Sequence, residues 1–412
     1  MYPLSAPLAL DIILTERCNH RCPHCYNPTR NNRNCNSPNQ DSIDHIYSII
    51  RDNGITGVTI TGGEPLIEHD MLLLLLSKLK ELGVSVSINT NITLLNKYYL
   101  KEIINISSEI SLLISLPSIE ENECDIITGV RGSYKKIISN LEMCLKEHVD
   151  VGLNIVITNH NRHIVPNIKL FVQKYRVTFL SISPVISSDA VNCCDNSIYD
   201  EIIKELLYIK EHLGINTGSV EPFPMCQLSD PESYMSLEIS RCNAGISKIC
   251  VNVVDGNVFP CDHHPHSFGN IYGEKLQTIW NRMNEWRDSK ILPDSCRNCC
   301  WFHLCGGSCR IQKIIEINAK KEELNIKKTP IKTDIKLKWN KNVRIRKESL
   351  GYSISFGGNY IQIKKSAMPL LEIMMSLKSF SINDLTKYVH NTHIIHDMIF
   401  TLLLLGYVEI VD

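Results

Sequence analysis

Three cysteines stand close together near the start of the chain, at Cys18, Cys22 and Cys25. Their C-x3-C-x2-C spacing places them in one short loop. Thiolates are soft ligands that bind zinc or iron–sulfur clusters. A structural zinc site normally has four ligands, and no obvious fourth partner stands in this loop. A cubane cluster held by three thiolates would keep one iron open to a substrate, so the spacing favours such a cluster over a zinc knuckle.

A mostly apolar run from Leu8 to Leu14 directly precedes this loop and predicts a buried strand. A second strand is predicted at Gly57–Thr61, and Gly62-Gly63-Glu64-Pro65 follows it. Glycines at a strand end let the backbone approach a ligand closely, although a simple turn would use the same residues.

The first half of the chain alternates short apolar runs with amphipathic stretches. Six strands alternating with helices predict an α/β fold with a parallel sheet, open or closed into part of a barrel. Active sites of such barrels lie at the C-terminal ends of the strands, where the cysteine loop falls. The predicted strands are Ala9–Leu14, Gly57–Thr61, Val84–Asn89, Ile110–Leu116, Val151–Ile157 and Val177–Ser183, and the predicted helices are Ile43–Asn53, Met71–Leu82, Lys97–Ile104, Tyr134–Glu147 and Ile164–Tyr175.

The cysteine loop and the G-G-E-P segment together resemble the radical S-adenosylmethionine (SAM) enzymes. The resemblance implies a partial (β/α)6 barrel over residues 1–190. It also implies that the three cysteines hold a [4Fe–4S] cluster whose open iron chelates SAM. One electron, from a donor such as flavodoxin or ferredoxin, would then cleave SAM to a 5′-deoxyadenosyl radical that takes hydrogen from the substrate.

The same resemblance assigns contacts to SAM. Arginine suits a carboxylate because its planar fork donates two parallel hydrogen bonds. The simpler alternatives are a packing aromatic for the tyrosine and a solvated turn residue for the arginine. The residues implied are Tyr26 beside the adenine, Gly62, Gly63 and Glu64 at the amine, Ser115 at the ribose, and Arg131 at the carboxylate of SAM or substrate.

A second cysteine array follows a helix predicted at 198–213. It reads Cys242-x13-Gly256-x4-Cys261 and then C-x2-C-x5-C-x3-C from Cys296 to Cys309, and Asp255-Gly256 predicts a hairpin turn. A zinc ribbon would also use two cysteine pairs. The joint spacing resembles the SPASM extension of radical SAM enzymes, which binds auxiliary iron–sulfur clusters. The SPASM-like domain is expected within residues 191–312.

The SPASM resemblance implies one or two auxiliary clusters. Cys226, Cys242, Cys261 and Cys309 would bind the first, with Cys250 as the alternative to Cys226, and Cys296, Cys299 and Cys305 would bind the second. The second cluster normally takes a further cysteine downstream, and none follows Cys309. A non-cysteine ligand, an open iron, or a reduced or absent cluster would each account for this departure.

Asp262 is the candidate catalytic residue. An aspartate directly after this cysteine acts as a general base in the sulfatase-maturing members of the family, and a carboxylate here could accept a proton as the substrate radical is oxidised. A turn aspartate is the simpler reading, and the neighbouring His263, His264 and His266 fit polar lining. The remaining cysteines, Cys35, Cys124, Cys144, Cys193 and Cys194, match no spacing and fit small buried side chains.

Composition limits the classes of function. The 412-residue chain has a net charge of −1, which disfavours nucleic acid as a partner. It has no apolar stretch long enough to span a membrane and no signal peptide, so a cytoplasmic location is expected. Seventeen cysteines without an export signal indicate metal or redox chemistry rather than disulfides.

The last part of the chain changes character. A lysine-rich linker is predicted at 313–342, and residues 343–412 predict a β-hairpin sheet, three helices and a last strand. This order describes a winged-helix-like domain and resembles the peptide-recognition element (RRE) known from pyrroloquinoline quinone biosynthesis, where a leader peptide adds a strand to the sheet. A generic winged helix is the alternative.

These parts predict a maturase that crosslinks a ribosomally made precursor peptide, with a carbon–carbon cyclophane as the first hypothesis. Thioether formation, epimerisation and a sulfatase-type oxidation to formylglycine are the enzyme alternatives. The C-terminal domain argues against the last, because sulfatase maturases lack it. A cluster-based sensor and an RNA-modifying enzyme are further alternatives, disfavoured by the G-G-E-P segment and by the charge balance respectively.

Overall fold

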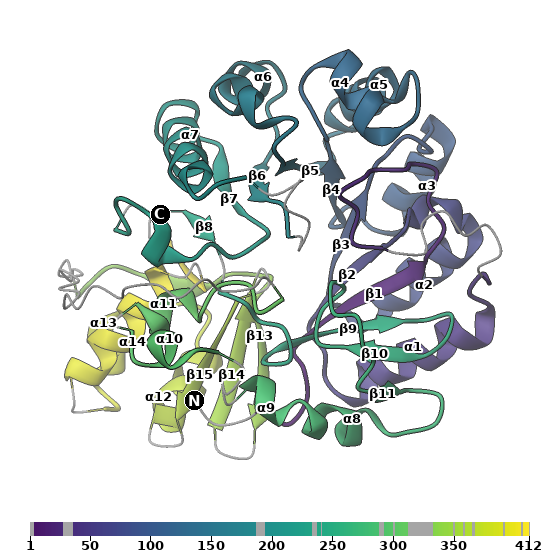
Figure 1. Cartoon of the computed structure of the whole chain (residues 1–412). Helices are drawn as coiled ribbons and strands as arrows, with labels where there is room; N and C mark the ends of the chain where they lie inside the picture. Colours follow the sequence, from purple (N-terminus) through teal and green to yellow (C-terminus); the bar gives the residue numbers. More distant parts are fainter. Residues whose placement is uncertain are drawn as a thin grey trace. The chain divides into compact units, whose positions relative to one another are not determined.

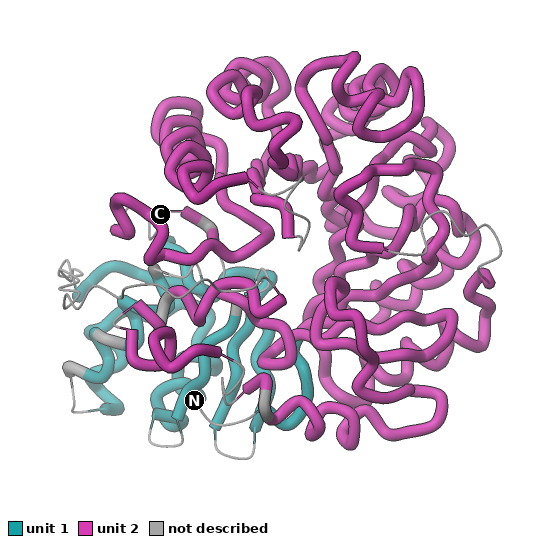
Figure 2. Tube along the Cα trace, viewed as in Figure 1, with its two compact units in different colours: residues 1–8, 323–412 teal, residues 9–322 magenta. Residues whose placement is uncertain are grey.

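The computed structural model forms two compact units, residues 9–322 and residues 1–8 with 323–412 (Figure 2). Cys35, Cys193, Cys300, residues 313–332 of the predicted linker and the glycine pair at 357–358 lie outside the described residues. The described residues are 4–27, 36–186, 194–232, 237–239, 241–287, 292–299, 301–311, 333–348, 351–356, 359–364, 367–389, 392–404 and 407–411.

The larger unit is built on one curved sheet that, among its described residues, has eleven strands in the order β11-β10-β9-β1-β2-β3-β4-β5-β6-β7-β8. Neighbouring strands from β9 through β1 to β8 are parallel, so their C-terminal ends share one edge. The parallel strands are β1 (Ala9–Thr15), β2 (Gly57–Gly62), β3 (Ser85–Thr90), β4 (Ser111–Ser115), β5 (Asp150–Ile157), β6 (Phe179–Pro184), β7 (Asn216–Ser219), β8 (Glu238–Ile239) and β9 (Lys248–Asn252).

The six strands predicted from the apolar runs are confirmed as β1 to β6. The sheet extends further than predicted, because β7 adds to β6 and β8 adds to β7. The sequence of β7, Asn-Thr-Gly-Ser, has no apolar run that could have indicated a strand. Its Thr217 is nevertheless buried and donates a hydrogen bond to the carbonyl of Leu206 at 3.1 Å.

Helices α2 to α7 lie along the outer side of the curved sheet (Figure 1). The helices of this unit bury apolar residues at helical spacing. In α1, for example, Ile43, Ile46 and Ile50 are buried. One predicted helix begins later than expected, since Pro166 falls in the 3₁₀ turn η2 (Arg162–Asn167) that precedes α6. The helices are α1 (Gln40–Asp52), α2 (His69–Leu82), α3 (Lys97–Ile106), α4 (Glu121–Thr128), α5 (Ser133–Lys146), α6 (Ile168–Lys174) and α7 (Ser197–Leu213).

The cysteine-rich segment continues the same sheet. Strand β9 pairs with β1, and β10 (Asn257–Phe259) returns antiparallel to it through the predicted Asp255-Gly256 turn. Gly256 has φ +78°, and a Cβ there would lie 2.4 Å from the ring of Tyr272, so the turn requires glycine. Short elements follow: β11 (Gly269–Asn270), α8 (Leu276–Arg282), α9 (Asn284–Arg287), α10 (Asp294–Arg297) and α11 (Phe302–Cys305).

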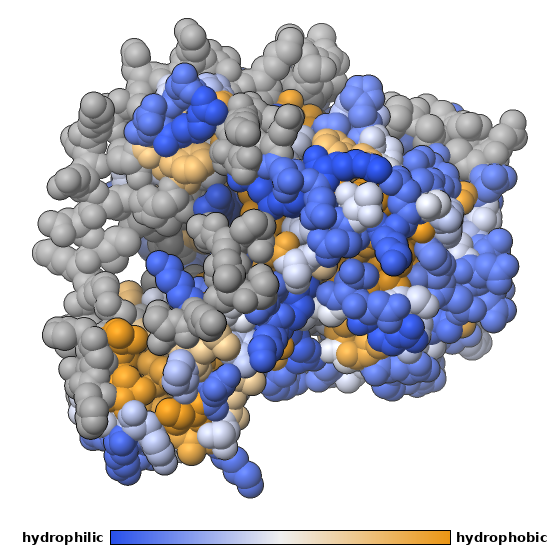
Figure 3. Space-filling view, turned by 90° about the horizontal axis from the view of Figure 1, so that it is seen from below, coloured by the Kyte–Doolittle hydropathy of each residue, from blue (hydrophilic) through white to orange (hydrophobic). Residues whose placement is uncertain are grey.

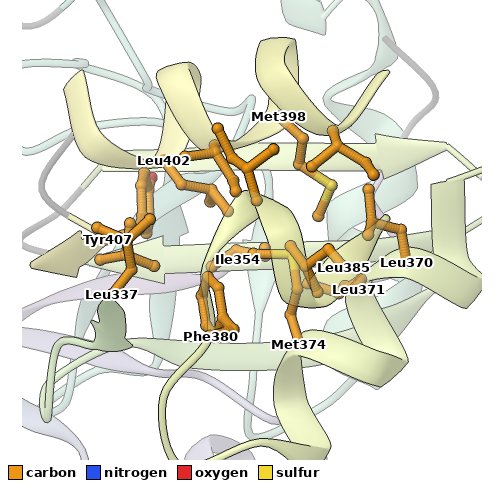
Figure 4. Close-up of a cluster of buried hydrophobic side chains, with 14 residues drawn as sticks. Leu337, Ile354, Leu370, Leu371, Met374, Phe380, Leu385, Met398, Leu402 and Tyr407 are labelled. Atoms are coloured by element: carbon orange, nitrogen blue, oxygen red, sulfur yellow. The ribbon is translucent and has the colours of Figure 1, made fainter. Parts of the chain in front are cut away.

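The smaller unit contains the predicted C-terminal elements in the predicted order. A three-stranded antiparallel sheet, β13-β14-β15, is followed by three helices and strand β16 around a core that includes Ile354, Phe380 and Tyr407 (Figure 4). The elements are β13 (Arg344–Glu348), β14 (Gly351–Phe356), β15 (Asn359–Lys364), α12 (Met368–Ser376), α13 (Ile382–Leu385), α14 (Thr392–Leu404) and β16 (Val408–Ile410).

Two segments that the sequence analysis assigned to other parts of the chain belong to this unit. Residues 337–339, placed in the predicted linker, form β12 (Leu337–Trp339) and pair antiparallel with β16. Residues 5–7, placed in the barrel, are held by Arg346 and Glu348: Ser5 Oγ donates to Glu348 Oε2 at 2.8 Å, and Arg346 Nη2 donates to the Ala6 carbonyl at 2.7 Å. Neither segment has an apolar run that would have predicted these contacts.

Among the residues coloured in Figure 3, hydrophilic ones predominate, and a group of hydrophobic ones gathers at the lower left. Among the described residues, the helices are too short or too polar for any of them to cross a membrane.

A substitution at Leu337 tests whether β12 stabilises the smaller unit. Leu337 is 1% exposed and exchanges two backbone hydrogen bonds with Phe380, at 2.7 and 2.8 Å. Replacing a buried leucine by alanine costs about 2–5 kcal/mol. We expect Leu337→Ala to speed amide hydrogen exchange in β16 by about thirtyfold or more, measured by mass spectrometry. Lys338→Ala, in the same strand but exposed, removes only a surface ion pair with Glu409 and should change exchange far less. Equal rates in both variants would show that β12 does not stabilise this unit.

Candidate active site

The cysteine loop brings Cys18, Cys22 and Cys25 together at the end of β1. Burial, and after it the charges of the other two thiols, raises the pKa of Cys22 to about 12. Burial also raises the pKa of Cys18 to about 11, against a hydrogen bond from the His20 N–H to its Sγ at 3.4 Å. Three partly buried thiols at one place need a metal charge to become thiolates, which fits a cluster site.

The G-G-E-P segment clamps this loop through its backbone. The N–H of Gly63 donates to the Thr15 carbonyl at 2.6 Å, and the N–H of Glu64 donates to the Arg17 carbonyl at 2.8 Å. A Cβ would lie 2.2 Å from Thr15 O at Gly62 and 2.1 Å from Arg17 O at Gly63. The two glycines are therefore needed for close approach to the cysteine loop, whereas the sequence alone suggested close approach to a ligand.

Glu64 is fully buried, and its carboxylate accepts hydrogen bonds from three protein groups. The donors are Thr90 Oγ1 at 2.6 Å, the Asn91 N–H at 2.7 Å and the Leu66 N–H at 3.0 Å. A carboxylate has about four lone-pair sites, so at most one site is left for an amine. Burial raises the pKa of Glu64 to about 7, although these hydrogen bonds oppose the rise. Glu64 thus also fixes the ends of β2 and β3, a role the sequence did not indicate.

Tyr26 links the cysteine loop to the cysteine-rich segment. Its ring centroid lies 4.6 Å from that of His263, and the nearby charge of Asp262 contributes to the raised pKa of Tyr26, for which burial is the main cause. The hydroxyl also lies 3.4 Å from the Gly62 carbonyl. The predicted adenine contact and the predicted base are therefore neighbours, although they are far apart in the sequence.

Asp262 lies in a partly buried network of charged side chains. His263 Nδ1 lies 3.0 Å from Asp262 Oδ1, and Lys248 Nζ forms an ion pair with Asp11 at 2.7 Å. Burial alone would raise the pKa of Asp262, but the charges of His263 and Lys248 outweigh it and hold that pKa below its usual range. Sequence analysis missed Asp11 and Lys248, because a charged residue in each of two strand sequences gives no sign that the strands pair.

Ser115 and Arg131 are exposed, at the end of β4 and between α4 and α5 respectively. Asp125, which sequence analysis missed, shapes the loop that carries Arg131: its carboxylate accepts from the Gly132 N–H at 2.6 Å and the Tyr134 N–H at 3.0 Å. The loop also touches the cysteine loop, because the N–H of Arg21 donates to the Thr128 carbonyl at 2.8 Å. The assigned contacts of Ser115 and Arg131 with SAM remain predictions.

The auxiliary cysteines fall into two groups. In the first, burial raises the pKa of Cys261 well above its usual value, and Asp262, Cys242 and Cys309 add to the rise. Arg310 lies beside Cys242 and Cys309, and its Nε and Nη2 are buried without a hydrogen-bond partner among the described residues. Unpaired N–H donors beside three thiols fit an anionic iron–sulfur cluster.

The second group differs from the assignment made from the sequence. Cys226, Cys296, Cys299 and Cys305 line one small cavity, together with apolar side chains that include Met225 and Phe302. Cys226 was expected beside Cys242, Cys261 and Cys309. The motif spacing fixes the cysteines within each short loop, but it does not fix which group an isolated upstream cysteine joins.

Comparison with known families agrees with this geometry. Residues 12–171 match the family model of the radical SAM superfamily, and residues 242–300 match SPASM, an iron–sulfur cluster-binding domain. This chain carries a radical SAM domain followed by a SPASM domain. Its cofactors are therefore SAM, a [4Fe–4S] cluster and auxiliary iron–sulfur clusters. Both matches lie within the larger unit.

Individual relatives are distant. The chain is 23% identical to "PqqA peptide cyclase" of Bradyrhizobium diazoefficiens (74% of this chain, 82% of the relative) and 24% identical to "Fe-coproporphyrin III synthase" of Methanosarcina barkeri (73% and 82%). Among solved structures it resembles SuiB of Streptococcus suis bound to its precursor peptide SuiA, with a TM-score of 0.62, 20% identity, and coverage of 75% of this chain and 73% of SuiB. The last likeness shows a shared fold.

The contact at Gly63 gives a test of the cysteine loop. We expect Gly63→Ala to displace Arg17 and the loop behind it, because the added Cβ has no room, and overpacking typically costs about 1–3 kcal/mol. Iron bound after anaerobic reconstitution should then fall by the amount of one cluster. Gly57→Ala is the matched control in the same strand, since its Cβ would have no neighbour closer than 4.0 Å. Full iron in Gly63→Ala would contradict the clamp.

Glu64 gives a pH prediction. Its pKa is raised from 4.5 to about 7, so the folded state binds more protons than the unfolded chain between these values. The contribution of Glu64 to the free energy of unfolding therefore falls as pH rises through this window. We expect the free energy of unfolding of the unchanged protein, minus that of Glu64→Gln, to fall across this pH window and then level off. Anaerobic urea unfolding at a series of pH values measures this difference. Glu81→Gln, at an exposed position, should show no such trend.

Proposed function

We propose that this chain is a maturase that crosslinks a ribosomally made precursor peptide, with a carbon–carbon cyclophane as the first product to test. The observation that carries the proposal is the combination of a radical SAM domain, a SPASM domain and a separate small unit that contains a three-stranded antiparallel sheet. Relatives named for a peptide cyclase and a structural neighbour bound to a precursor peptide support the substrate class.

The C-terminal unit offers a place for an extended leader peptide. Strand β15 lies at the edge of the three-stranded sheet, and its Ile361 and Ile363 pack against the core of the unit. Alternation along the strand directs Tyr360, Gln362 and Lys364 to the opposite face. A peptide strand added beside β15 would gain main-chain hydrogen bonds for affinity and contacts with alternate side chains for specificity.

The opposite edge strand, β13, contacts the N-terminal segment of the same chain. Arg346 and Glu348 of β13 hold residues 5–7 through hydrogen bonds of 2.7 to 3.2 Å. Leader docking at β15 would leave these contacts intact.

The bound cluster and SAM supply a carbon radical that can take a hydrogen atom from an unactivated C–H bond. Joining a β-carbon to an aromatic ring carbon breaks one C–H bond at each carbon. One hydrogen leaves as an atom with the SAM-derived radical. The other leaves as a proton, for which Asp262 is the base, and an electron, for which the auxiliary clusters are the acceptors. The location of Asp262, between Tyr26 and Cys261, supports this role.

The test is co-expression of the enzyme with a short peptide encoded beside its gene, followed by mass spectrometry of the peptide. We expect the loss of two hydrogens with the number of alkylatable thiols unchanged, and no change with the Cys25→Ala enzyme. Loss of one alkylatable thiol would indicate a thioether instead. An unchanged mass despite 5′-deoxyadenosine formation would contradict a peptide substrate and the docking role of the C-terminal unit.

The same assay isolates the role of Asp262. A positioned general base contributes about 10²–10⁴-fold, so we expect Asp262→Asn to lower the yield of crosslinked peptide at least tenfold while 5′-deoxyadenosine still forms. Asp255→Asn is the matched control in the same segment, at the turn between β9 and β10. Equal yields from both variants would exclude Asp262 as the base.

A further inference from the structure

One cavity of the cysteine-rich segment brings Cys226 beside the three cysteines assigned to the second auxiliary cluster. The pattern from Cys296 to Cys309 is followed by no further cysteine in the chain, so the second cluster lacks the ligand that usually lies downstream. The structure brings a cysteine to the same place from upstream. Cys226, in the short helix η3 (Met225–Gln227), lines one cavity with Cys296, Cys299 and Cys305.

A hydrogen bond holds the segment before Cys226 against the loop that carries Cys305: Ser308 Oγ donates to the Pro222 carbonyl at 3.0 Å. Cys305 Sγ itself lies 3.7 Å from the Phe223 carbonyl. Phe223 and Met225 are fully buried. The position of Cys226 is therefore set by the packing and hydrogen bonding of the segment that precedes it.

The chemistry of the cavity fits an iron–sulfur cluster. A [4Fe–4S] cluster takes four thiolates, and the described lining offers four thiols among mostly apolar neighbours such as Trp301 and Phe302. The four cysteines share this one cavity, and a cluster bound there would supply the positive charge that four thiolates need.

We propose that Cys226 is the fourth ligand of the second auxiliary cluster, completing the set of Cys296, Cys299 and Cys305 from upstream. The first auxiliary cluster then keeps Cys242, Cys261 and Cys309, with Cys250, the alternative named from the sequence, near Cys261. This assignment is independent of the substrate and would stand if the peptide proposal failed.

The test uses the full chain, reconstituted anaerobically, in a background in which the three cysteines of the N-terminal loop are alanine. Electron paramagnetic resonance of the reduced protein then reports the auxiliary clusters. Cys296→Ser and Cys242→Ser serve as references for the second and the first. We expect Cys226→Ser to change the signal that Cys296→Ser changes and to leave the other intact. A change in the Cys242-dependent signal, or in neither, overturns the proposal.

A second measurement covers the case in which Cys226→Ser alone misfolds. A triple variant with serine at 296, 299 and 305 removes the second cluster and leaves one auxiliary signal. Adding Cys226→Ser to this variant should change neither the remaining signal nor the iron content, because its cluster is already absent. A further loss of iron would place Cys226 on the first cluster and contradict the assignment. Cys144→Ser, at a buried cysteine outside both groups, is the matched control.

Discussion

The active site depends on a backbone contact that leaves no room for a side chain. Gly62 and Gly63 lie so close to Thr15 and Arg17 that a Cβ at either glycine would overlap a carbonyl oxygen. The hydrogen bonds across this contact join the ends of β1 and β2 and thereby fix the loop that carries the first three cysteines. Buried Glu64 continues the same connection to β3. The geometry of the cluster site is in this way set by main-chain contacts between strand ends.

Strand β1 also positions the auxiliary half of the molecule. It pairs with β2 on one side and with β9 on the other, so the cysteine-rich segment extends the barrel sheet. Asn252 at the end of β9 donates to Glu16 Oε1 at 3.0 Å, and Tyr26 meets Asp262 and His263 nearby. The parallel register places the C-terminal ends of both strands at one edge. The cysteine loop of the radical SAM domain and Asp262, which follows an auxiliary cysteine, are therefore brought together by sheet pairing.

The sequence predicted the features that depend on residues close together in the chain. Apolar periodicity indicated six parallel strands and the order of the C-terminal elements, and cysteine spacing indicated the cluster loops. It missed features that depend on tertiary partners. Polar β7 is a strand because β6 pairs with it, and β12 forms because Leu337 packs in a core built from distant residues. The Asp11–Lys248 pair exists only because β1 and β9 are neighbours.

Cys226 shows why a single ligand is the hardest to assign from sequence. Cysteines in a C-x2-C pair must share a site because the chain between them is too short to separate them. An isolated cysteine has no such restriction, since the entropy cost of closing a flexible loop grows slowly with its length. Its group is decided by what anchors its own segment, here the buried Phe223 and the hydrogen bond from Ser308 to Pro222. Those contacts are tertiary, so the sequence does not show them, and they place Cys226 with the cysteines of the second cluster.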